Sequence, residues 1–196
     1  MKSDIVLAGV GGQGILTIAT ILGAAALEDG LYLKQAEVHG MSQRGGDVQS
    51  NLRISSHPIH SDLIPLGGAD IIVSLEPMEA LRYLPFLSEK GWIVTNSVPF
   101  VNIDNYPDMQ KVEADLRRNP NLVMFDMDAT AKEVATSRSS NLVLLGAASP
   151  FIDMNPEKIE SAVYALFIRK GEKVAQANIA AFREGRRIAS EMAAAK

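Results

Sequence analysis

Short apolar runs separated by glycine or polar breaks fill the first two thirds of the chain, a pattern that predicts strands alternating with helices. The first run predicts a strand over Asp4–Gly9. A long stretch of small and apolar residues then predicts a helix over Gln13–Glu28, which Asp29-Gly30 ends. Leu31–Val38 is predicted to be a second strand, so the chain opens with one βαβ unit.

The same alternation continues and then gives way to helices. Val48–Ser55 alternates apolar and polar positions, which predicts a strand with one wetter face. Further strands are predicted at Ala69–Leu75, Trp92–Asn96 and Leu122–Asp126. Helices are predicted at Met78–Leu87, Lys111–Asn119, Ala129–Ala135 (capped by Asp128), Asn141–Ser149, Pro156–Phe167 and Glu172–Ala195. We predict an α/β fold: a Rossmann-like open, largely parallel sheet with flanking helices and a helical C-terminal third, with residues 1–196 forming a single domain.

The junction between the first strand and the first helix has the G-x-G-x-x-G spacing of a dinucleotide-binding turn. Glycines let the backbone approach a phosphate, and the start of the helix presents free N–H groups and its positive end. Tight packing of strand on helix explains the same glycines. A nicotinamide dinucleotide also needs a carboxylate at the end of the second strand, a place that Glu37 fits imperfectly. The candidate ligand-binding or partner-facing residues of this turn are Gly9, Gly11, Gly12, Gln13 and Gly14.

The loop that follows the second predicted strand is rich in glycine and in polar side chains. It lies at the C-terminal end of that strand, where open α/β sheets place ligand sites. Histidine is the side chain whose ordinary pKa is nearest to neutral, which makes His39 a candidate, and Arg44 suits a carboxylate or a phosphate. We interpret the loop as a site or an interface, the alternative being a passive polar surface loop. Its candidate residues are Glu37, His39, Ser42, Gln43 and Arg44.

Composition narrows the chemistry further. The 196 residues include no cysteine, which excludes disulfides, a cysteine nucleophile and a cysteine-ligated iron–sulfur cluster in this chain. The net charge of −4 and the scattered basic residues do not suit a general nucleic-acid binder. No metal site is predicted, and His57 and His60 are expected to be surface residues. The apolar stretch over residues 15–27 is shorter than the roughly 20 residues that span a bilayer. With no signal peptide predicted, we expect a cytoplasmic protein without a membrane partner.

Two segments taken together resemble a known family. Gly9-Val10-Gly11-Gly12-Gln13-Gly14-Ile15 after an N-terminal strand, followed by Glu37-Val38-His39-Gly40-Met41-Ser42-Gln43-Arg44-Gly45-Gly46, is similar to the gamma-type domain of 2-oxoacid:ferredoxin oxidoreductases. Residues 141–146 and the pattern Asn178-x-x-x-Phe182-x-x-Gly185 are similar to the same family. The resemblance covers nearly the whole chain and is nearest to the indolepyruvate-type branch of the pyruvate/ketoisovalerate oxidoreductase gamma-type domains.

The resemblance implies a subunit rather than a complete enzyme. Members of the family decarboxylate a 2-oxoacid on thiamine diphosphate, pass electrons through iron–sulfur clusters to ferredoxin and release an acyl-CoA. A large alpha subunit is implied to carry both thiamine diphosphate and the clusters, which agrees with the absence of cysteine here. The isolated chain is then expected to be inactive. Arg44 is expected to anchor a 2-oxoacid carboxylate or a CoA phosphate, with a salt bridge to the alpha subunit as the alternative.

Two other classes of function stay open on the sequence. A stand-alone NAD-type binding domain depends on Glu37 alone and predicts saturable binding of NADH by the isolated chain. A purely scaffolding subunit predicts that the polar loop residues are buried against a partner. Homodimerisation is also compatible with the sequence, because Gly185 and Ala189 permit close helix packing, either within the chain or between chains.

Overall fold

The computed structural model describes residues 1–39 and 46–196, whose strands form one open six-stranded sheet. Its order is β2-β3-β1-β4-β5-β6, and β1, β4, β5 and β6 pair in parallel. β3 is antiparallel to both of its neighbours, β1 and β2. The strands are β1 (Lys2–Val10), β2 (Tyr32–His39), β3 (Asp47–Ser55), β4 (Ala69–Ser74), β5 (Leu87–Asn96) and β6 (Leu122–Phe125). The predicted Rossmann-like, largely parallel sheet is confirmed.

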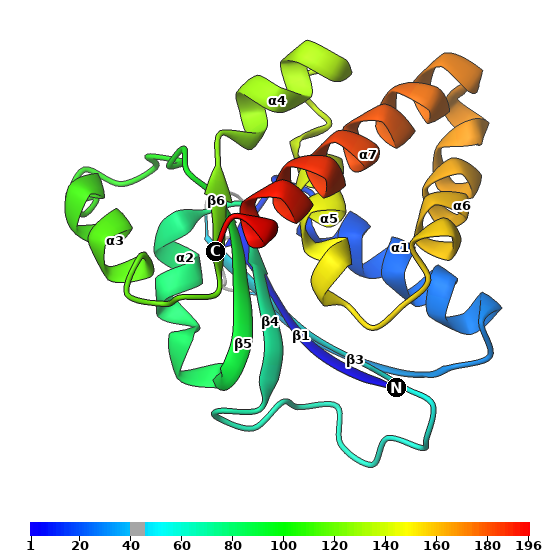
Figure 1. Cartoon of the computed structure of the whole chain (residues 1–196), viewed down its shortest axis with the longest axis horizontal. Coiled ribbons are helices and arrows are strands. Elements are labelled where there is room, and N and C mark those ends of the chain that lie inside the picture. Colours follow the sequence, from blue (N-terminus) through cyan, green and yellow to red (C-terminus); the bar gives the residue numbers. More distant parts are fainter. Residues whose placement is uncertain (40–45) are drawn as a thin grey trace.

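Helices cover both faces of the sheet, as Figure 1 shows. Because side chains alternate along a strand, Ile5 and Leu7 of β1 enter the core on one face, and Val6 and Ala8 enter the core on the other. The first face carries α1 (Ile15–Glu28), α4 (Met127–Val134), α5 (Ser140–Ala148), α6 (Pro156–Phe167) and α7 (Glu172–Ala194). The second face carries α2 (Pro77–Arg82) and α3 (Met109–Leu116). No helix of the described residues is long and apolar enough to cross a membrane.

The opening βαβ unit differs from the prediction in one respect. β1 and β2 point the same way, but β3 lies between them and pairs with both. β3 follows β2 as an antiparallel hairpin partner, and its buried Leu52 and Ile54 continue the apolar face of β1. Alternation within β3 was predictable, whereas its insertion beside β1 depends on pairing between segments distant in sequence.

Two predicted elements are wrong in detail. The helix expected over Met78–Leu87 ends at Arg82, and a short 3-10 turn around Pro85 leads into β5 at Leu87. β6 pairs with β5 only from Ile93 onward, so the first half of β5 lacks a neighbour on that side and its Glu89 and Lys90 are exposed. In the sequence, the polar residues Glu89 and Lys90 followed by Gly91 look like the end of a helix, which explains why the predicted helix was too long.

Candidate functional site

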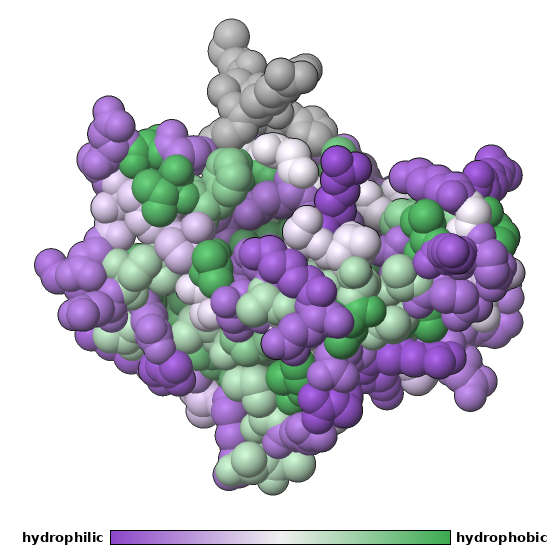
Figure 2. Space-filling view, turned by 90° about the horizontal axis from the view of Figure 1, so that it is seen from above, coloured by the Kyte–Doolittle hydropathy of each residue, from purple (hydrophilic) through white to green (hydrophobic). Residues whose placement is uncertain are grey.

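The C-terminal ends of β1, β4 and β5 surround a hollow of about 490 Å³ beside the glycine turn. Its lining includes Gly12 and Gln13 after β1, Leu75 after β4, Asn96 of β5 and Asn141 of α5. The connection from β1 runs through α1 on one face, whereas β4 leads into α2 on the other face. The hollow therefore lies at the switch point where open α/β sheets bind ligands. Figure 2 looks onto this end of the molecule and shows polar and apolar side chains interspersed.

Gln13 stabilises the turn by hydrogen bonds, and Gly9 allows close packing within it. The Gln13 Oε1 atom accepts a hydrogen bond from the Val10 N–H at 2.8 Å, and its Nε2 donates to the Leu75 carbonyl at 3.4 Å. A Cβ added at Gly9 would lie 2.8 Å from Gln13 Oε1 and 2.9 Å from Ile15 Cγ1. Both residues thus have a packing role, which the sequence had offered as the second explanation of this turn.

Gly12 and Gly14 have backbone conformations that favour glycine, with φ of +103° and +82°. A Cβ at Gly12 would meet nothing within 4 Å, whereas one at Gly14 would lie 2.7 Å from Asn141 Nδ2. That amide donates to the Gly14 carbonyl at 3.3 Å. Gly14 is also the N-cap of α1, where no side-chain cap bond forms within the described chain. Gly12 lines the hollow, and the start of α1 offers N–H groups there.

Asp128 forms the opposite wall instead of capping a helix. The cap of α4 is Asp126, whose Oδ1 accepts from the Ala129 N–H at 2.8 Å. The Asp128 carboxylate accepts from the Ser140 hydroxyl at 2.5 Å and from Asn96 Nδ2 at 2.9 Å. Sequence reasoning missed this role, because two candidate caps, Asp126 and Asp128, stand two residues apart and only the fold distinguishes them.

A network of buried carboxyl groups lies next to the turn, on the α2 side. Glu76 and Glu79 are almost completely buried. Glu76 caps α2 by accepting from the Glu79 N–H at 3.0 Å, and the Tyr106 hydroxyl donates to its other oxygen. The Tyr83 hydroxyl donates to Asp47 Oδ2 at 2.6 Å. The network ties the start of β3 and the 97–108 loop to α2.

Burial is the main cause of the shifted pKa values of Glu79, Tyr83 and Tyr106 in this network. The pKa of the Glu79 carboxyl is raised, mainly because burial disfavours its charged form, although the salt bridge to Arg82 at 2.6 Å opposes the shift. The pKa values of the Tyr83 and Tyr106 hydroxyls are raised as well, first by burial and then by their hydrogen bonds to carboxylates. Both tyrosines therefore act as hydrogen-bond donors at neutral pH.

The structure separates Glu37 from the glycine turn. Glu37 pairs with Ser50 in the sheet, and β3 lies between it and β1. Two strand spacings amount to about 10 Å, so Glu37 is not at the end of the strand beside β1, where the ribose of a dinucleotide would be bound. Its Oε1 accepts from Gln35 Nε2 at 2.5 Å. Glu37 therefore does not supply the carboxylate that the NAD alternative needs beside the glycine turn.

The remaining candidates of this loop are only partly described. His39 is the last residue of β2 and pairs with Val48. Ser42, Gln43 and Arg44 lie outside the described residues. The far end of the loop is joined to the turn, because the Gly11 N–H donates to the Gly46 carbonyl at 2.9 Å.

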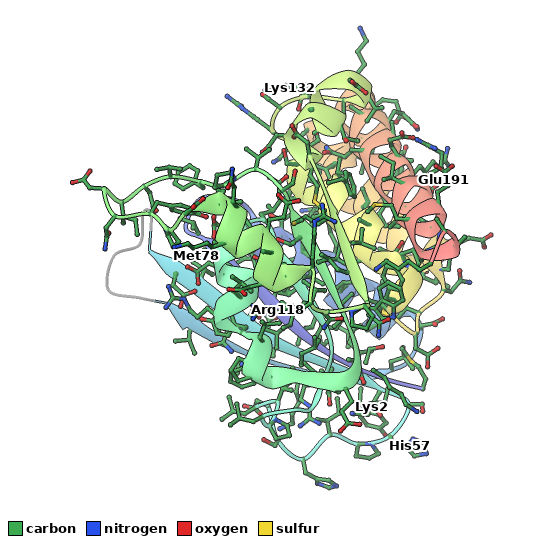
Figure 3. All side chains as sticks on the ribbon, turned by 60° about the vertical axis from the view of Figure 1, so that its left-hand side comes forward. Lys2, His57, Met78, Arg118, Lys132 and Glu191 are labelled. Atoms are coloured by element: carbon green, nitrogen blue, oxygen red, sulfur yellow. The ribbon has the colours of Figure 1, made fainter. Side chains whose placement is uncertain are left out.

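No metal centre is found among residues 1–39 and 46–196, where no three His, Cys, Asp or Glu side chains gather as ligands. His57 lies at the opposite end of the molecule from Lys132 of α4 (Figure 3) and contacts the Ser56 hydroxyl at 3.1 Å. It is therefore remote from the ligand-binding edge of the sheet.

Fold and site together define a Rossmann-like α/β protein with an anion-compatible glycine turn and an inserted antiparallel strand. A model of the pyruvate ferredoxin/flavodoxin oxidoreductase family matches residues 4–188, and the chain belongs to this family. It is 36% identical to indolepyruvate oxidoreductase subunit IorB of Thermococcus kodakarensis, over 96% of each chain. It is 29% identical to 2-oxoglutarate synthase subunit KorC of Methanothermobacter marburgensis, over 97% of this chain and 98% of that one. Like these relatives, it is part of a multi-subunit oxidoreductase.

Solved structures agree with this assignment. The gamma subunit of the keto/oxoacid ferredoxin oxidoreductase of Geobacter sulfurreducens superposes with a TM-score of 0.70 at 25% identity, covering 96% of this chain and 99% of that one. The 2-oxoglutarate:ferredoxin oxidoreductase of Magnetococcus marinus, solved with 2-oxoglutarate, coenzyme A and succinyl-CoA, gives a TM-score of 0.75 at 23% identity. That match covers 97% of the present chain but only 31% of the Magnetococcus chain. At 23% identity, it shows a shared fold and nothing more.

Proposed function

We propose that residues 1–196 form one gamma-type domain that serves as the non-cluster subunit of an indolepyruvate-type 2-oxoacid:ferredoxin oxidoreductase in the cytoplasm. A large alpha subunit supplies thiamine diphosphate and iron–sulfur clusters, which carry out decarboxylation and electron transfer to ferredoxin. The present chain contributes one polar edge, formed by the turn Gly9–Gly14 and the loop His39–Gly46, which faces the alpha subunit's reaction centre.

The near full-length match to indolepyruvate oxidoreductase subunits carries this proposal. The absence of cysteine supports the division of labour, because the usual ligands of iron–sulfur clusters are cysteine thiolates. The position of the hollow supports the choice of edge, since it opens at the switch point between β1 and β4.

At that edge the chain's own residues bind and orient a group rather than transform it. The N–H groups at the start of α1 and the exposed Gly12 suit a carboxylate or a phosphate. Gln13, with both ends of its amide engaged, keeps the turn fixed against β4. Arg44 is proposed to pair with the 2-oxoacid carboxylate or with a CoA phosphate, and His39 or Gln43 to orient that group by hydrogen bonding. Ser42 stays a candidate residue of the same loop.

Replacement of Arg44 by alanine in the purified complex tests this ligand role. We expect assembly to be retained and the Michaelis constant for the 2-oxoacid or for CoA to rise about tenfold or more, because a charge-assisted bond is lost. Arg118→Ala is the matched control, since Arg118 lies just after α3, its side chain is 82% exposed, and its only salt bridge to another described residue is with Asp115. Unchanged constants for both substrates would refute the ligand role, and loss of assembly would favour the salt bridge to the alpha subunit.

Purification from the native cell tests the partner. We expect a large, brown, cluster-bearing subunit to accompany the chain. A colourless homo-oligomer would contradict the proposal. Saturable micromolar binding of NADH by the isolated chain would revive the dinucleotide-binding alternative, which the position of Glu37 now disfavours. Full activity of complexes in which the edge residues are replaced would leave only a scaffolding role.

A further inference from the structure

A second hollow, of about 710 Å³, lies beside the glycine-turn hollow on the helical side of the sheet. It runs between the start of α1, the end of α6 and the start of α7, and we call it the α1–α6–α7 groove. Side chains that line it include Leu16, Thr20, Arg138, Leu166, Lys170 and Val174. Arg138 and Asn141 line both hollows, so the groove continues into the glycine-turn edge.

The charge of the groove is opposite to that of the chain. The chain carries 23 acidic and 19 basic residues, yet the described residues lining the groove include Arg138 and Lys170 and no carboxylate. Neither cation forms a salt bridge with another described residue, and the Lys170 ammonium lies 5.3 Å from the centre of the Phe167 ring. Arg183, further along α7 and outside the groove lining, is by contrast paired with Glu160 at 2.5 Å. The groove therefore holds uncompensated positive charge that attracts acidic groups.

The lining of the groove also includes apolar side chains. Leu16, Leu166 and Val174 are 37%, 37% and 38% exposed, on three different helices. The buried amide of Asn178 has its partners already, because its Oδ1 accepts from Ser139 and its Nδ2 donates to the Val174 carbonyl. Among the described lining residues, the buried Asn141 Oδ1 has no hydrogen-bond partner, and it lies at the end of the groove shared with the glycine-turn hollow. A small-molecule site fixes its ligand through well-placed free polar groups. A groove between helices with apolar anchors and flanking charges instead suits a segment of another protein.

We propose that the α1–α6–α7 groove docks an acidic segment of the partner subunit. Apolar side chains of that segment would contact Leu16, Leu166 and Val174, and its carboxylates would pair with Arg138 and Lys170. The inference rests on the proposed function in one respect, namely that a partner subunit exists. Docking there positions the partner directly beside Gly12 and Asn141, so one contact surface serves both assembly and alignment of the glycine-turn hollow.

Charge reversal in the reconstituted complex tests the proposal. The groove variant is Arg138→Glu/Lys170→Glu, and the matched control is Lys132→Glu/Arg169→Glu, which changes net charge equally at exposed positions outside the groove lining. Circular dichroism checks that both variants fold. We expect the dissociation constant of the complex to rise at least tenfold for the groove variant and less than threefold for the control. Assembly of the wild-type complex should weaken with added salt, and that of the groove variant much less.

The possible outcomes separate this proposal from the one before. If the wild-type chain assembles with a cluster-bearing partner and both variants assemble equally well, the groove proposal is wrong and the proposed function stands. If the wild-type chain has no such partner, both the groove proposal and the proposed function are wrong. If inorganic phosphate or CoA binds the free wild-type chain saturably and the groove variant loses that binding without losing assembly, the groove is a small-anion site and the docking proposal is wrong.

Discussion

Gly146 of α5 and Gly185 of α7 each face a backbone carbonyl of the other helix. A Cβ on Gly146 would lie 1.9 Å from the Phe182 carbonyl oxygen, and one on Gly185 would lie 2.0 Å from the Val143 carbonyl oxygen. The two helices thus cross with their backbones almost in contact, which leaves α5 buried along its whole length. The close helix packing expected at Gly185 is therefore made within the chain, with α5 as the neighbour.

Replacing Gly146 by alanine should destabilise the protein by about 3 kcal/mol, because either the helices separate or the backbone shifts. In an unhindered helix the same change stabilises by about 1 kcal/mol, so the sign is diagnostic. Urea denaturation followed by the fluorescence of Trp92, the only tryptophan, measures the change. Gly23→Ala in α1 is the control, since its Cβ would meet only the flexible end of Leu33 at 3.1 Å. Equal effects at the two positions would contradict the packing argument.

Gly12→Ala and Gly14→Ala separate backbone strain from crowding at the turn. Both residues have positive φ, so each substitution should cost about 1 kcal/mol through strain. Only Gly14→Ala also pushes against the Asn141 amide, and we expect it to cost at least about 1 kcal/mol more. Thermal denaturation of the two variants side by side measures the difference. A Gly12 variant as unstable as the Gly14 variant would show that strain alone governs this turn.

Asn96 joins the end of β5 to α4, because its Oδ1 accepts from the Met127 N–H at 3.0 Å and its Nδ2 donates to Asp128. Asn96→Ala leaves a buried N–H without this acceptor and should lower the free energy of unfolding by about 2 kcal/mol. Asn105→Ala, in the exposed part of the 97–108 loop, is the control and should change it by less than about 0.5 kcal/mol. Chemical denaturation provides both values, and equal losses would refute the bridging role.

The raised pKa of Glu79 predicts a specific pH dependence of stability. Folding favours the protonated form of this carboxyl, so its contribution is fully present below the ordinary pKa of 4.5 and is lost as pH rises through the raised value. Glu79→Gln cannot titrate there. The stability of the wild type relative to this variant should therefore fall as pH increases from about 4 to about 8. Urea unfolding across that range measures it, with Glu133→Gln on the exposed surface of α4 as the control. A difference independent of pH would contradict the assignment.

Local chemistry explains which elements were predictable. Asn155 and Pro156 begin α6 as expected, because an N-cap side chain followed by proline specifies a helix start without help from the rest of the fold. The strand at β3 was predicted from alternation alone. The helix over Met78–Leu87 was not correct, since the polar residues of β5 reflect a missing neighbour strand, which no local pattern encodes.

The candidate site was less accessible to sequence reasoning. Spacing alone identified the glycine turn, yet it could not distinguish Gly12, which faces open space, from Gly9, which is packed against Gln13 and Ile15. Asp128 and Asn141 reach the hollow only because α4 and α5 begin at the same edge of the sheet as the glycine turn. The turn itself lies more than 100 residues before them in the sequence. Such residues become candidates only when the topology is known.

Because β3 is inserted between β2 and β1, the connection from β2 to β3 at the glycine-turn edge can vary independently of β1 and α1. β2 ends at His39 and its neighbour β3 begins at Asp47, so the residues between them connect two adjacent antiparallel strands rather than a strand and a helix. Insertions, deletions or exchanges in such a connection leave the register of β1 and the position of α1 unchanged. The proposed ligand role of this edge can therefore be altered by grafting the segment from another member of the family, without rebuilding the core.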